Sequence, residues 1–232
     1  MLQWFVSLIL VATYSYPQSD FNYTDLEVEN NGTVWILPNS GTEILRLTDD
    51  GESEVFDISF AGIPEGLTIV STGRFAVSFR SPFSVYIFDS DDRLLEELAT
   101  ESIGDITFSG FNILGTDMFQ NEVISIPDYE RIWRNCVSSN SRLSVAPNGS
   151  ALIDGAEGVF LLQYGEIAKK IAEKGSACYS EAGILVLSEG VLVNSSTGPD
   201  TVLTHLPHSF LSSSPDGRIV VLWGSSYPLI LE

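Results

Sequence analysis

Cysteine, histidine and methionine each occur only twice in this chain of 232 residues, and basic residues are scarce. Eleven Lys and Arg stand against 31 Asp and Glu, which gives a formal net charge of −20 at pH 7. A surface this acidic repels phosphate backbones and anionic lipid headgroups, so we expect no nucleic-acid partner. The acidic residues are spread along the chain rather than gathered in a tail, which is typical of a well-solvated surface.

Common catalytic and nucleotide-binding motifs are also missing. The chain contains no G-x-S-x-G nucleophile elbow, no P-loop and no G-x-G-x-x-G sequence. Cys136 and Cys178 lack the C-x-x-C spacing of a redox or zinc site. In an exported protein they are able to form a disulfide, but they fall in different sequence repeats, so we favour two free thiols.

Only one long apolar run is present, from Leu2 to Ala12. Its eleven or so residues suit the core of a signal peptide and are too few for the roughly 20 needed to span a bilayer. No Lys or Arg precedes the run, so an uncleaved anchor and a buried first strand remain alternatives. We predict a signal peptide at 1–16, a single domain at 17–232, and a secreted, periplasmic or cell-envelope location without stable membrane insertion after cleavage.

Turn sequences recur along the chain at a regular interval. They fall at Asn31-Gly32, Thr72-Gly73, Gly110-Phe111-Asn112, Asn148-Gly149, Ala182-Gly183 and Asp216-Gly217, about 34 to 41 residues apart. An apolar or β-branched run follows each turn, which is a hairpin signal. Asn22, Asn31, Asn148 and Asn194 also start Asn-x-Ser/Thr sequons, but for Asn31 and Asn148 turn chemistry alone explains the residues.

Each repeat contains four short runs that read as strands, which is the content of a propeller blade. The sixth repeat ends before its fourth strand. We therefore predict an all-β, six-bladed propeller of four-stranded antiparallel blades, in which Asp20 to Asp25 supply the missing outer strand and close the ring. Leu94–Leu98 and Ile167–Ala172 are rich in helix formers, but they stand where outer strands belong and are interpreted as strands.

The turns Pro147-Asn148-Gly149 and Pro215-Asp216-Gly217, each ahead of an apolar strand, resemble those of six-bladed propellers of the NHL, TolB-like and gluconolactonase-like group, which includes SMP-30-like proteins. The resemblance covers roughly residues 20 to 232. It implies the architecture but no single activity, because the group includes both protein-binding scaffolds and metal-dependent hydrolases.

Candidate binding residues are the polar side chains of the longer connections, which a propeller gathers near one end of its axis. These are Arg80, Asp117, Arg134, Glu157, Glu189, His205, His208 and Tyr227. His205 and His208 have a spacing that two ligands of a metal site could share, but no third ligand is apparent, so a plain connecting loop is the simpler interpretation. The acidic turns Asp49-Asp50 and Asp89 to Asp92 do not match a calcium-loop pattern and are explained by turn chemistry.

The inner strands argue against an enzyme. A lactonase-type site needs carboxylate and amide side chains near the axis, whereas Leu143 to Ala146 and Phe210 to Ser213 are mainly small and apolar with Ser hydroxyls. We therefore expect an exported, monomeric, non-catalytic propeller without a cofactor that binds a protein, peptide or other ligand. The alternative is a metal-dependent hydrolase of the gluconolactonase-like type, with a divalent ion such as calcium. The identity of the partner stays open.

Overall fold

The computed structural model describes residues 23–38, 42–48, 52–59, 62–71, 73–91, 93–134, 141–146, 148–163, 169–181, 183–188, 191–194, 201–203, 208–218, 220–224 and 228–231. Every regular element in these ranges is a strand, and none is a helix that could cross a membrane. The predicted signal peptide, Cys136, Glu189, His205 and Tyr227 lie outside the described residues.

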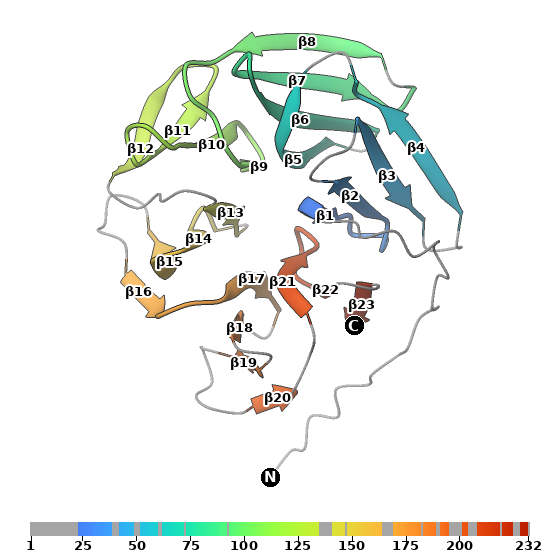
Figure 1. Cartoon of the computed structure of the whole chain (residues 1–232). Helices are drawn as coiled ribbons and strands as arrows, with labels where there is room; N and C mark the ends of the chain where they lie inside the picture. The colour runs from blue at the N-terminus through green and yellow to red at the C-terminus, as the bar shows by residue number, and fades with distance from the viewer. Residues whose placement is uncertain are drawn as a thin grey trace.

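The strands form antiparallel sheets that are arranged around a common centre (Figure 1). The first two sheets contain β1 (Tyr23–Val28), β2 (Val34–Pro38), β3 (Glu43–Leu47), β4 (Ser53–Asp57), β5 (Ile63–Ser71), β6 (Arg74–Arg80), β7 (Ser84–Asp89) and β8 (Leu94–Ala99). The next two contain β9 (Ile106–Phe108), β10 (Ile113–Asp117), β11 (Glu122–Ile126), β12 (Glu130–Arg134), β13 (Arg142–Val145), β14 (Ala151–Gly155), β15 (Gly158–Leu162) and β16 (Lys169–Ala172). The last two contain β17 (Ser176–Ser180), β18 (Gly183–Ser188), β19 (Val191–Asn194), β20 (Thr201–Leu203), β21 (His208–Ser213), β22 (Val220–Gly224) and β23 (Pro228–Leu231).

The prediction of a β-propeller with four-stranded antiparallel blades is confirmed, but the prediction of six such blades is wrong. Within the described ranges, five sheets have four strands and the sheet β21-β22-β23 has three. The predicted closing strand overlaps β1, which pairs with β2 as the inner strand of the first blade. Its residues Leu26 and Val28 are buried in the core, so β1 is not available as an outer strand elsewhere. Among the strands that the structure describes, none from the N-terminus pairs with the sheet β21-β22-β23 to close the ring.

The six recurring turns lie where the sequence places them, between the first and second strands of each sheet. Their glycines all have positive φ, from 73° at Gly73 to 121° at Gly183. Residues with a Cβ rarely adopt this conformation, which explains why a glycine recurs at this point of every repeat. The two helix-prone segments are also strands where they are described, as β8 and β16.

Apolar side chains fill the spaces between neighbouring sheets. Between the first two blades, Phe75 lies with its ring centroid 5.0 Å from that of Trp35 and 5.1 Å from that of Phe88. Smaller clusters join the later blades in the same way, and Cys178, a buried free thiol, belongs to the one between β17 and β21. Each blade is thus apolar on both faces, as stacking around a ring requires. β1 lies beside β21, so the first and last sheets are neighbours (Figure 1).

We predict that Phe75→Ala destabilises the protein by about 3–5 kcal/mol, because a fully buried ring is replaced by a cavity between two blades. Urea unfolding followed by tryptophan fluorescence measures the change, since Trp35 reports on this cluster. Phe111, whose side chain is 93% exposed, provides the control. Phe111→Ala is expected to change the free energy of unfolding by less than about 0.5 kcal/mol. Equal effects of the two substitutions would contradict the described packing.

Candidate functional site

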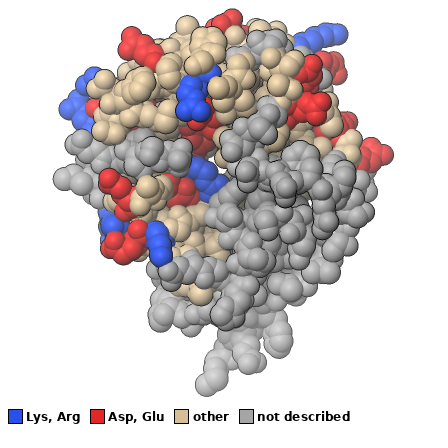
Figure 2. Space-filling view, viewed as in Figure 1, with Lys and Arg blue, Asp and Glu red and all other residues tan. Residues whose placement is uncertain are grey.

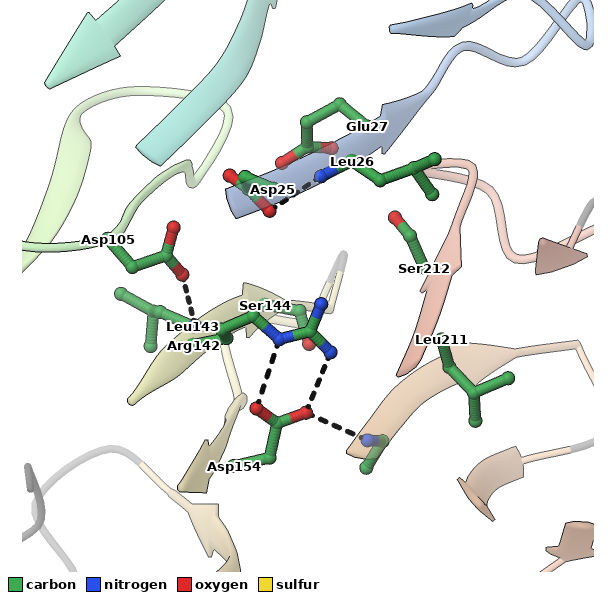
Figure 3. Close-up of a pocket in the computed structure, with 11 residues that line it drawn as sticks. Asp25, Leu26, Glu27, Asp105, Arg142, Leu143, Ser144, Asp154, Leu211 and Ser212 are labelled. Carbon is green, nitrogen blue, oxygen red and sulfur yellow. Dashed lines mark hydrogen bonds and ion pairs between the residues drawn. The ribbon is translucent and has the colours of Figure 1, made fainter. Parts of the chain in front are cut away.

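The inner strands of the sheets surround a small cavity on the axis of the propeller (Figure 3). We call it the axial pocket. Its volume is about 30 Å³, room for one or two water molecules. Its polar lining comes from Asp25, Glu27, Asp105, Arg142, Ser144, Asp154 and Ser212. In the space-filling view, acidic and basic side chains meet at a hollow near the middle of the visible face (Figure 2). The pocket therefore places four carboxyl groups around one guanidinium.

Most of these carboxyl groups join neighbouring blades. Asp25 Oδ2 accepts a hydrogen bond from the backbone N–H of Leu67, at 2.7 Å. Asp105 Oδ2 accepts one from Leu143, at 2.5 Å, and Asp154 Oδ2 accepts one from Ala177, at 3.0 Å. In each case the N–H donor belongs to the inner strand of the next blade.

Two hydroxyl groups make the same kind of bond in the remaining blades. Thr68 Oγ1 accepts the N–H of Phe108, and Ser176 Oγ accepts the N–H of Leu211, both at 2.9 Å. We call the five contacts the interblade hydrogen bonds. Together they connect each of the six sheets to the next in chain order, from the first to the last.

Arg142 is the cation of the axial pocket. Its Nε and one terminal nitrogen contact the two oxygens of Asp154, at 3.3 and 3.2 Å, and the same terminal nitrogen donates to Ser176 Oγ. The dashed lines of Figure 3 show this two-point contact. Planar pairing of this kind fixes the guanidinium plane, so Arg142 orients two groups that themselves hold the fifth and sixth sheets.

The surroundings of three acids that line the pocket with Arg142 raise their pKa values. Burial raises the pKa of Asp25 from 3.8 to about 6, against the opposing effects of Arg142 and of two backbone N–H donors. Burial and the charge of Asp25 raise the pKa of Asp105 well above its usual range, and the same two causes act on the pKa of Glu27. The carboxyl groups disfavour one another's ionisation because one guanidinium compensates only part of their charge.

Ser144 Oγ is a further polar group of this pocket. It is buried and has no hydrogen-bond partner in the described part of the chain. The described residues contain no cluster of three or more His, Cys, Asp or Glu side chains placed to hold a metal ion. Among the described residues, then, the polar side chains of the pocket that make no hydrogen bond to the backbone of the next blade are Glu27, Arg142, Ser144 and Ser212.

A larger concavity of about 470 Å³ lies between the second and third blades. We call it the side groove. It is bounded by the end of β8 and by β10 to β12, and its polar and aromatic lining includes Glu101, Asp117, Glu122, Tyr129 and Arg131. Strands alternate in direction within each sheet, so β8 and β10 end, and β11 begins, at the end of the propeller where the inner strands begin. Thr100, Asp117 and Glu122 of the groove lie at this end. The groove therefore reaches the same end of the propeller as the axial pocket.

Of the candidate residues whose side chains the structure describes, Arg80, Asp117, Arg134 and Glu157, none lines the axial pocket. Asp117 lies in the side groove, and Arg134 is 3.8 Å from Glu122 of that groove. Arg80 pairs with Glu65 at 2.9 Å, and Glu157 is exposed in the turn between β14 and β15. His208 is the first residue of β21, and only its backbone is described. The structure thus brings Asp117 and Arg134 near one groove and leaves Arg80 and Glu157 apart from it.

The expectation that the inner strands are mainly small and apolar is wrong at the axis. Asp25, Asp105, Arg142 and Ser176 each stand directly before the first buried apolar residue of an inner strand, and Gly66 has the same place in the second blade. A Cβ at Gly66 would lie 2.7 Å from Asp105 Oδ1, so glycine leaves room for that carboxylate. Aligning the repeats on this position, rather than on the turns, would have revealed the axial residues from sequence.

Comparisons with known proteins support the fold and no more. No family model and no curated protein sequence matches the chain. A streptogramin B lyase structure matches with a TM-score of 0.64 at 13% identity, over 93% of this chain and 80% of that one. Virginiamycin B lyase from Staphylococcus aureus matches with a TM-score of 0.60 at 12% identity, over 88% and 78%. A protein of unknown function from Bacteroides thetaiotaomicron matches with a TM-score of 0.68 at 10% identity, over 93% and 70%. Membership of the NHL and gluconolactonase-like group stays a prediction.

We predict that stability falls as the pH rises from about 4 to about 6, because Asp25 binds its proton more tightly in the folded state. Its contribution is fully present below the unfolded pKa of 3.8 and is lost as the pH passes the folded pKa of about 6. The shift corresponds to on the order of 3 kcal/mol. Urea unfolding at a series of pH values measures the slope. Asp25→Asn should flatten it whatever the variant's stability at any one pH, whereas an unchanged slope would assign the effect to other groups.

Proposed function

We propose that the protein is an exported, non-catalytic binding scaffold: a single propeller domain that takes a protein, peptide or small ligand at the end where the axial pocket and the side groove lie. A monomer is the expected state. Residues 1–16 serve as the signal peptide in this proposal, and the mature domain acts outside the cytoplasm, where its net charge of −20 keeps it soluble.

The observation that carries the proposal is the use of the axial acids as structural acceptors. Asp25, Asp105 and Asp154 each accept a backbone N–H from the next blade, so one oxygen of each carboxyl group already serves to join two blades. The remaining space of about 30 Å³ is far below the roughly 300 Å³ at which small-molecule pockets begin. A site built in this way stabilises the ring and leaves recognition to wider surfaces.

A metal-dependent hydrolase of the gluconolactonase-like type is the second candidate, and one observation favours it. Carboxyl groups with raised pKa values in a pocket, as found for Asp25, Glu27 and Asp105, are common in acid–base catalysis. Propellers named as lyases are among the structural neighbours, so this architecture is compatible with catalysis. Glu27 and Asp105 would then be the expected acid–base groups.

Turnover and metal content distinguish the two candidates. The purified protein is incubated with a panel of esters and lactones, and its divalent ions are counted by elemental analysis. The scaffold predicts no chelator-sensitive turnover and far less than one ion per chain, with no shift of Tm on adding calcium or chelator. A turnover that Glu27→Gln abolishes in a folded variant, together with about one ion per chain, would replace the scaffold by the hydrolase.

A further inference from the structure

The side groove has the size of a ligand site. Its volume of about 470 Å³ lies within the roughly 300–1,000 Å³ of pockets that bury small ligands or single anchoring side chains. Its walls are part polar and part apolar, because Ile124 and the ring of Tyr129 lie among the charged residues. The axial pocket, by comparison, is too small to accept a side chain.

The charges of the groove leave an acidic excess. Glu122 is compensated by Arg131 at 2.9 Å and by Arg134 at 3.8 Å. Glu101 is exposed, and no ion pair within the described part of the chain engages it. The hydrogen bonds of Asp117 both end on Oδ1, where the N–H groups of Phe119 and Gln120 donate at 2.9 and 3.0 Å. Glu101 and Asp117 therefore keep negative charge available to a ligand.

Tyr129 lines the groove together with these two acids. Burial raises the pKa of its phenol, and the charges of Glu101 and Asp117 act in the same direction. The hydroxyl donates to the carbonyl of Ala99 at 2.7 Å, which fixes one end of the ring, and the residue is still 38% exposed. Its φ of 55° is unusual for a residue with a side chain, and such strain tends to occur at functional positions.

An exposed aromatic ring adjoins the groove. Phe119 follows closely after Asp117 in the turn between β10 and β11, and its side chain is 69% exposed. One edge rests on Phe83 of the second blade, with the ring centroids 5.9 Å apart. Because the backbone of this turn is fixed by Asp117, the ring is presented to solvent in a defined position. Exposed aromatic residues of this kind are frequent anchors of protein interfaces.

We infer that the side groove binds an arginine or lysine side chain of a partner peptide segment, held by Glu101, Asp117 and the face of Tyr129, while Phe119 packs against an adjacent apolar side chain of the same segment. Carboxylates supply the charge complementarity, and the aromatic face attracts a cation directly. The inference rests on the proposed binding function and assigns to it the chemistry of the partner.

A labelled hexapeptide with two arginines flanking one phenylalanine tests the assignment by fluorescence anisotropy at physiological salt. The matched probe has citrulline in place of both arginines, which removes the charge and keeps the shape. We expect the arginine peptide to bind at least tenfold more tightly than the citrulline peptide. Glu101→Gln and Phe119→Ala are each expected to weaken its binding roughly three- to tenfold, the loss typical of one charged or aromatic contact.

Two substitutions on the same blades control for the protein's overall negative charge. Glu96→Gln removes one exposed carboxylate of β8, and Phe111→Ala removes an exposed ring of the turn between β9 and β10. Neither should change the affinity by more than about twofold. Binding that all four substitutions affect equally would be diffuse attraction, and would overturn the groove assignment while leaving the scaffold in place. Absence of binding to the unaltered protein would also overturn it, whereas the scaffold itself fails only on the turnover and metal measurements.

Discussion

The interblade hydrogen bonds are the constraint on which the rest of this structure depends. Apolar packing between the sheets is extensive, but it does not fix how far one sheet is displaced relative to its neighbour. Many such displacements would bury a similar apolar area. A hydrogen bond from one inner strand to the backbone of the next has only one satisfactory geometry. Since these bonds lie near the axis, where neighbouring strands are closest, they set the position of every blade relative to the following one. The aromatic cluster around Phe75 then fills a space whose shape is already determined.

Structure and candidate function are joined at the axis. Three of the four carboxyl groups described at the axis also hold the blades, and Arg142 balances part of their charge through Asp154. Burial raises the pKa values of Asp25 and Asp105, because a carboxyl group that is fixed at the axis cannot move towards solvent. The outer strands of the second and third blades, β7, β8, β11 and β12, contribute to none of the interblade hydrogen bonds. That difference explains why the side groove, rather than the axis, has charge available for recognition.

Much of the fold could be predicted from the sequence because its turns are chemically explicit. Gly32, Gly73 and Gly149 mark positions with positive φ, and the spacing between them gives the strand content of each repeat. The number of complete blades was wrong because Asp20 to Asp25 look like a spare strand, whereas Tyr23 to Asp25 belong to β1, which Leu26 and Val28 anchor in the core. Asp117, one of the candidate residues from the sequence, lines the side groove. Asp25, Asp105 and Arg142 were missed, because each stands just before an apolar run and the strands were predicted from the apolar runs alone.

The interblade hydrogen bonds also have a direction: every acceptor side chain belongs to one blade and every donor to the next along the chain. Each of the first five blades therefore supplies the side-chain acceptor for its hydrogen bond to the next blade, and the next blade supplies only a backbone N–H. Growth of such a ring by duplication would require no new chemistry at the junctions, since a copied unit brings its acceptor with it. Aspartate serves as the acceptor in three blades, threonine in one and serine in one, and they come from different positions of the inner two strands, so the junction requires an oxygen within reach of the neighbouring backbone rather than one particular side chain.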